Sequence, residues 1–196
     1  MIGRQSRSRG LIKPSASATA LVALGVVVAG CGADPPPDPT ATAAAASAMS
    51  EPGPAGITNG HAELTAPASL SVTDVRVGSH AGFDRVVYEL GGVGTPGWTV
   101  RYVDQAVQDA SGKVLDVPGR SIIEVSLTGT GYPFDTGVPP YAGPNPLPGA
   151  GVVSAVRMPT VFEGVTQSFV GLSTGPRPVT VSLLTDPVRL VLDVAG

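Results

Sequence analysis

Residues 178–194 read "PVTVSLLTDPVRLVLDV", and this stretch decides the fold class. Apolar and polar residues alternate on both sides of the turn signal Thr185-Asp186-Pro187. Strict alternation is typical of a β-strand with one buried face, because successive side chains point to opposite sides of a sheet. The stretch therefore predicts two strands, with buried positions at Val179, Val181 and Leu183 in the first and at Val188, Leu190, Leu192 and Val194 in the second.

The same period of two recurs through the preceding hundred residues. It predicts further strands over 72–77, 84–90, 98–109, 113–117, 121–127, 151–158 and 164–172. Glycine and proline separate these segments, and none of them shows a sustained helical period. Residues 69–196 are therefore predicted to form one all-β domain, an antiparallel β-sandwich or barrel-like sheet of about eight or nine strands.

The N-terminus has the pattern of an export signal. Residues 1–18 hold four basic residues and no acidic one, and an apolar run over 20–30 follows. This run is shorter than the about 20 residues that a membrane-spanning helix needs. Residues 1–30 are therefore predicted to be a signal peptide.

Cys31 is the only cysteine and follows the apolar run directly. Val28-Ala29-Gly30-Cys31 resembles the bacterial lipobox. The resemblance implies cleavage between Gly30 and Cys31 and a lipid on the cysteine, with fatty acids such as palmitate, that anchors the protein to the outer face of the cell membrane. A buried core cysteine and an uncleaved anchor helix are the alternatives. Lipidation would use the only thiol, so the domain would have to be stable without a disulfide.

Residues 31–68 are rich in Pro, Ala and Thr and have no period, which predicts a disordered tether after the lipidated cysteine. Removal of residues 1–30 takes four of the twelve basic residues and leaves eight against fifteen acidic ones, a formal net charge of −7. Such a charge argues against nucleic acid as a partner.

Several motifs in the domain resemble one known family. These are Gly82-Phe83-Asp84-Arg85-Val86-Val87-Tyr88-Glu89, Trp98 before a strand, Phe162-Glu163-Gly164, and the segment 184–193. Together they resemble the AMIN-like domain of actinobacterial lipoproteins. The resemblance covers most of residues 70–195 and implies a non-catalytic β module that binds peptidoglycan or an envelope protein. It implies no set of binding residues.

Two motifs that suggest catalysis lack the context they need. Gly171-Leu172-Ser173-Thr174-Gly175 fits a nucleophile elbow, but prolines and a strand follow it where a helix is required. Gly92-Val93-Gly94-Thr95-Pro96-Gly97 fits a dinucleotide-binding pattern but is interpreted as a hairpin loop. Two scattered histidines make no zinc site. The acidic residues Asp84, Glu89, Glu124 and Asp193 are interpreted as a solvated face. No enzyme activity, metal or cofactor is therefore expected.

The long segment 129–151 between two predicted strands is a candidate for ligand contact. Loops of this length in a compact domain are usually functional or disordered. Tyr132, Phe134 and Tyr141 could stack on sugar rings with Asp135 beside them, or could pack the loop onto the sandwich.

Two functions follow from these features. The first is an envelope lipoprotein whose domain binds or positions at the cell wall or an envelope partner. The second is a carrier of a small apolar ligand, such as a lipid or glycolipid, held in a cavity under the loop.

Overall fold

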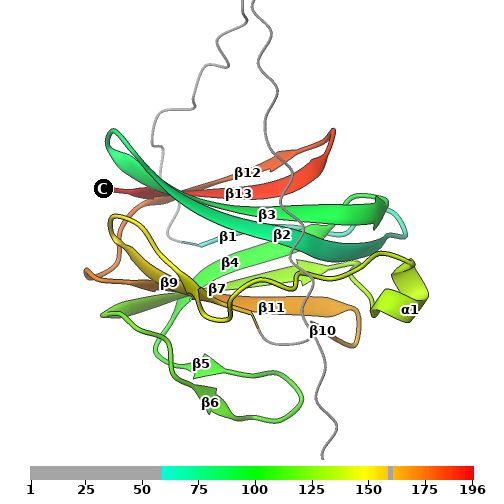
Figure 1. The fold of residues 1–196 in the computed structure, drawn as a ribbon, viewed down its shortest axis with the longest axis horizontal. Helices are drawn as coiled ribbons and strands as arrows, with labels where there is room; N and C mark the ends of the chain where they lie inside the picture. The colour runs from blue at the N-terminus through cyan, green and yellow to red at the C-terminus, as the bar shows by residue number, and fades with distance from the viewer. Residues whose placement is uncertain (1–58, 159–160) are drawn as a thin grey trace, which may run out of the picture. The chain divides into compact units, whose positions relative to one another are not determined.

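The computed structural model describes residues 59–158 and 161–196. These residues form an all-β domain of two antiparallel sheets packed face to face, as the alternation predicted (Figure 1). The smaller sheet has the order β12-β13-β3-β2, and the larger has the order β1-β4-β7-β11-β9-β8, with β10 paired to β11. The structure thus selects the sandwich from the two predicted architectures.

Eight of the strands in the described residues have five or more residues. They are β2 (Ser69–His80), β3 (Phe83–Val93), β4 (Gly97–Val103), β7 (Ser121–Thr128), β9 (Val153–Arg157), β11 (Val165–Leu172), β12 (Val179–Leu184) and β13 (Val188–Ala195). The short elements are β1 (Gly60–Ala62), β5 (Ala106–Val107), β6 (Val114–Leu115), α1 (Pro133–Thr136), β8 (Leu147–Pro148) and β10 (Val161–Phe162). The strand β1 lies within the segment assigned to the tether by composition, and it pairs with β4.

The core lies between the two sheets and is built from the predicted inward positions. The alternating residues Val86, Tyr88 and Leu90 of β3 are buried, and so are Leu190, Leu192 and Val194 of β13. The positions Ile123, Val125 and Leu127 of β7 cover them from the larger sheet. A hydrogen bond of 2.8 Å between the hydroxyls of Tyr88 and Ser168 joins the two sheets inside this core.

Two connections differ from the sequence predictions. The predicted strand over 98–109 ends at Val103, and the chain then forms the β5–β6 hairpin, which projects below the larger sheet in Figure 1. The 92–97 motif is not a hairpin loop: residues 94–96 connect the two sheets, because β3 pairs with β2 and β13 in one sheet while β4 pairs with β1 and β7 in the other. Alternation marks the strands, but it carries no information about which sheet each strand joins.

Candidate functional site

The segment 129–151 covers the edge of strand β2. The Gly131 N–H donates to the Leu70 carbonyl at 2.9 Å, and the Tyr141 N–H donates to the Val72 carbonyl at 2.7 Å. In Figure 1 the segment runs from α1, at one end of the sandwich, across the front of the two sheets toward β9. Backbone hydrogen bonds therefore fix the loop to β2 at Gly131 and at Tyr141.

The short helix α1 and the residue before it present two aromatic rings to solvent. The rings of Tyr132 and Phe134 are stacked, with centroids 5.3 Å apart and planes inclined by 7°. The exposed fraction is 82% for Phe134 and 39% for Tyr132. Asp135, the next residue, is also exposed and belongs to the first turn of α1. Three of the four predicted contact residues thus lie together on one surface.

Tyr141 has a different role from the other predicted contact residues. It is half-buried and packs against the main core, and its hydroxyl donates to the Pro144 carbonyl at 3.0 Å. Burial raises the pKa of Tyr141, and the charge of Asp74 raises it further. The self-packing interpretation of the loop aromatics therefore describes Tyr141, whereas Tyr132 and Phe134 remain available to a partner.

A cavity of about 410 Å³ lies between the loop, strand β2 and strand β11. Its walls are mainly apolar, and its size falls within the range of small-molecule sites, about 300–1,000 Å³. The lining residues are Ser71, Val72, Gly131, Tyr132, Pro133, Pro140, Tyr141, Gly143, Asn145, Met158, Val161 and Thr166. No charged side chain is among these lining residues, so the cavity suits an uncharged, largely apolar group.

The two buried hydroxyls of the cavity wall already have partners within the protein. The hydroxyls of Ser71 and Thr136 are 2.7 Å apart, and the Thr166 hydroxyl donates to Thr130 Oγ1 at 3.0 Å. Both Ser71 and Thr166 are almost completely buried. These hydroxyls keep spare acceptor lone pairs, but binding cannot depend on an ion pair with them.

Sequence reasoning missed the residues that close the cavity behind the loop. Val72, Met158 and Thr166 come from three distant segments, and each has the ordinary apolar or β-branched character of a strand residue. Asn145 joins the loop to this wall: its side-chain oxygen accepts from the Met158 N–H at 3.1 Å, and its side-chain amide donates to the Met158 carbonyl. In the sequence, a single asparagine in a loop is only a weak signal for such a contact. Only the folded topology brings these segments together.

The motif over 171–175 does not have the geometry of a nucleophile elbow. Ser173 follows strand β11, and its hydroxyl donates to the Val152 carbonyl at 3.2 Å. No helix follows Ser173 in the described residues 161–196, so the elbow geometry is not formed. Among the residues that the structure describes, no group of three His, Cys, Asp or Glu side chains could hold a metal ion.

Two acidic residues lie in the interior, which corrects the solvated-face interpretation. Asp84 is 3% exposed, and its carboxylate accepts from the Val152 N–H at 2.5 Å. Glu124 is 6% exposed, and its carboxylate accepts from Arg101 Nε and Gln167 Nε2, both at 2.8 Å. The 149–152 turn covers Asp84, and the β5–β6 hairpin lies near Glu124. Strand alternation gives no information about either of these covering segments.

The comparisons with known proteins give one match. A family model described as the AMIN-like domain matches residues 70–196. No match was found among curated proteins or among solved structures.

The predicted anchor and cleavage site, Cys31 and Gly30, lie outside the described residues. None of the helical residues within 59–158 and 161–196 belongs to a segment long and apolar enough to span a membrane.

Proposed function

This chain belongs to the AMIN-like domain family, and on that premise we propose that it is a non-catalytic lipoprotein of the cell envelope. Its β domain binds or positions at the cell wall or at an envelope protein, and a lipid on Cys31 holds it at the outer face of the cell membrane. The observation that carries the binding role is the exposed Tyr132–Phe134 pair beside an uncharged cavity.

The exposed aromatic pair is costly to leave in water and suits a sugar face or an apolar partner surface. Exposed aromatic rings are enriched at interaction sites because they bury a large area with few rotatable bonds. Asp135 lies beside the rings and offers carboxylate oxygens to the hydroxyls of a sugar. The pair is also preorganised, since the hydrogen bonds of Gly131 and Tyr141 fix the loop to β2.

The test is co-sedimentation with purified cell wall, using residues 49–196. All main core residues lie between 70 and 194, so this fragment contains the whole described fold. Replacement of both Tyr132 and Phe134 by Ala should weaken binding at least about tenfold, since two interface aromatics contribute more than 1.4 kcal/mol together.

The matched control removes a second stacked aromatic pair at the other end of strand β2. His80 and Phe83 have ring centroids 4.8 Å apart. Their double replacement by Ala should leave sedimentation unchanged. Equal loss in both variants would show that the loop surface is not the site, and no sedimentation of the unaltered fragment would remove the cell wall as its partner.

The anchor is tested on the full chain in a bacterium that lipidates exported proteins. We expect labelled palmitate on a mature chain that begins at Cys31, and no label after Cys31→Ser. A mature chain that retains residues 1–30, or one that is cleaved elsewhere, would contradict the lipobox assignment.

The cavity favours a second function, the carriage of a small apolar ligand such as a lipid or glycolipid. A volume of about 410 Å³ with uncharged walls accommodates part of an acyl or isoprenoid chain. Native mass spectrometry of residues 49–196 incubated with an envelope lipid extract should then detect a bound lipid. Met158→Trp should reduce its occupancy by filling the cavity, whereas the volume-conserving Met158→Leu should retain it. Absence of any bound lipid would exclude the carrier function.

A further inference from the structure

We propose that strand β12 pairs with the β12 strand of a second copy of this chain, joining the two small sheets into one antiparallel sheet across a two-fold axis. This inference concerns an edge remote in the sheet order from the loop site, and it stands apart from the proposed function. In the sheet order β12-β13-β3-β2, β12 is an edge strand, and within the described residues it pairs only with β13.

The direction of the backbone groups on β12 follows from one hydrogen bond. The Ala195 N–H donates to the Pro178 carbonyl at 3.0 Å. Hydrogen-bonded and non-hydrogen-bonded positions alternate along an antiparallel pair. The N–H and C=O groups of Thr180, Ser182 and Leu184 therefore point toward β13. Those of Val179, Val181 and Leu183 point outward, and none of the hydrogen bonds among the described residues satisfies them.

The other edges of the two sheets are short or covered. The β2 edge is covered by the 129–151 loop, through the hydrogen bonds of Gly131 and Tyr141. The strand β8 has two residues, one of them Pro148, and β1 has three. By contrast, β12 has six residues without charge, proline or bulge. Natural edge strands normally carry one of these features to prevent pairing with another chain.

The core side of β12 is also left incompletely covered. Val181 and Leu183 pack against the main core, yet they remain half-buried, whereas their neighbours Leu190 and Leu192 on β13 are fully buried. A further strand beyond β12 would place apolar side chains against Val181 and Leu183. Such a strand would satisfy the outward backbone groups at the same time.

A second copy of β12 fits this edge because the strand is self-complementary when reversed. With Val181 on the two-fold axis, Val179 of one copy faces Leu183 of the other on the core side. On the outer side Thr180 faces Ser182, a hydroxyl pair of the kind that stabilises sheets. The outward groups of Val179, Val181 and Leu183 then exchange about six backbone hydrogen bonds.

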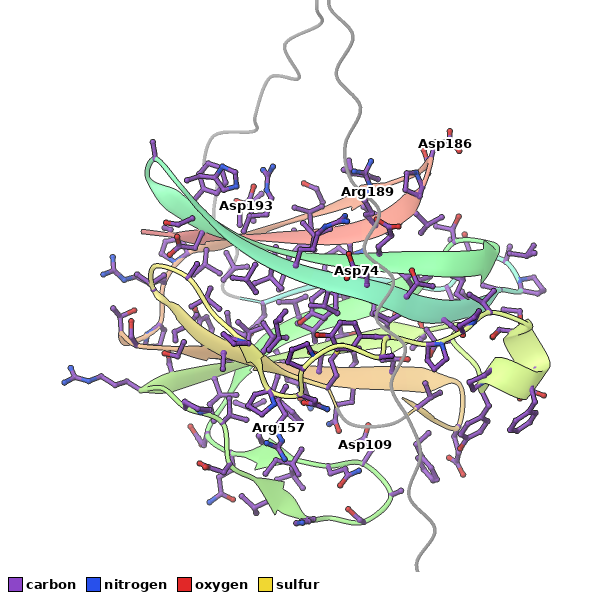
Figure 2. All side chains as sticks on the ribbon, viewed as in Figure 1. Asp74, Asp109, Arg157, Asp186, Arg189 and Asp193 are labelled. Atoms are coloured by element: carbon purple, nitrogen blue, oxygen red, sulfur yellow. The ribbon has the colours of Figure 1, made fainter. Side chains whose placement is uncertain are left out.

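The charges at the ends of β12 match the same reversed pairing. Arg177 precedes the strand, and Asp186 is exposed at the tip of the β12–β13 turn (Figure 2). In the proposed register Arg177 of one copy faces Thr185 of the other, one residue from Asp186. A parallel arrangement would instead bring like charges together. An antiparallel two-fold pairing also closes on itself, whereas a head-to-tail arrangement would extend into filaments.

Sedimentation-velocity analysis of residues 49–196 tests the pairing. We expect a concentration-dependent dimer. Val181→Pro should abolish it, because the proline ring replaces an outward N–H and blocks the edge without removing a hydrogen bond to β13. Val181→Ala is the control, since it loses similar core contacts but keeps the N–H, and it should still dimerise. A monomer at all concentrations, or equal loss of dimer in both variants, would overturn the proposal.

Cysteine cross-linking tests the register without perturbing the fold. Residues 49–196 contain no cysteine, so Thr180→Cys and Ser182→Cys can be placed in separately tagged chains. Under mild oxidation the mixture should form mixed disulfides at least tenfold faster than either variant alone. Cross-linking within one variant alone, or none, would overturn the proposed register.

Discussion

The hydrogen bond between Tyr88 and Ser168 predicts that replacing one partner costs more stability than replacing the other, because only one of the two hydroxyls is the donor. Both residues are completely buried, and their hydroxyl oxygens are 2.8 Å apart. The Ser168 hydroxyl also donates to the Arg157 carbonyl at 3.2 Å. Because a serine hydroxyl has a single hydrogen, Tyr88 must be the donor in the bond that joins the sheets.

The two single replacements should therefore differ in cost. Tyr88→Phe removes the donor but leaves Ser168 bonded to Arg157, so the loss is that of one hydrogen bond, about 0.5–1.5 kcal/mol. Ser168→Ala leaves the Tyr88 hydroxyl buried without a partner, which costs about 1–3 kcal/mol. Addition of Tyr88→Phe to Ser168→Ala should recover part of that loss, because the unpaired hydroxyl is removed.

The assay is urea unfolding of residues 49–196, with the free energy of unfolding obtained by linear extrapolation. Leu70→Met serves as a control for a volume-conserving change elsewhere in the core, and it should cost less than about 1.5 kcal/mol. If Tyr88→Phe costs as much as Ser168→Ala, or if the double variant is the least stable of the three, the assigned direction of donation is wrong.

Three further predictions concern pH, a turn and the hairpin. Burial raises the pKa of Tyr88 above its ordinary value of 10.0, so the folded state keeps a proton that the unfolded chain loses. Stability should be unaffected by this group below about pH 10 and fall as the pH rises further, less steeply in Tyr88→Phe, as measured by urea unfolding at each pH. Gly151→Ala should destabilise the protein more than Gly137→Ala. Both glycines have positive φ, but only at position 151 would a Cβ meet the Asp84 carboxylate. Thermal unfolding compares the two variants, and equal losses of stability would contradict the contact. Gln167→Ala should speed hydrogen exchange in the β5–β6 hairpin and leave the main sheets protected, and an unchanged hairpin would show that Gln167 does not hold it.

The sheet architecture could be predicted because each strand is buried on one face. The alternation at Val86, Tyr88 and Leu90 fixes which side of β3 enters the core, and the structure confirms all three. Alternation gives no information about a segment that packs on the outer face of a sheet. It therefore assigned Glu124 to solvent, although Gln167 and Arg101 surround its carboxylate beside the β5–β6 hairpin.

The site could be predicted only in part. The length of the segment 129–151 and the scarcity of aromatic residues in this domain made Tyr132, Phe134 and Tyr141 candidates for ligand contact. Their separation into an exposed pair and a half-buried anchor depends on where the loop meets β2, which is a tertiary property. The wall of the cavity at Met158 and Thr166 gave no local signal, because apolar and β-branched residues are expected in any strand.

The central claim, that the surface around α1 and the loop cavity is the binding site, is tested most directly by amide chemical-shift mapping. Isotope-labelled residues 49–196 would be titrated with solubilised cell-wall fragments. Shift changes concentrated in residues 130–147 and in the first residues of β2 are predicted. Changes confined to the β5–β6 hairpin or to the His80–Phe83 end of the sandwich, or no changes at saturating fragment, would contradict the account.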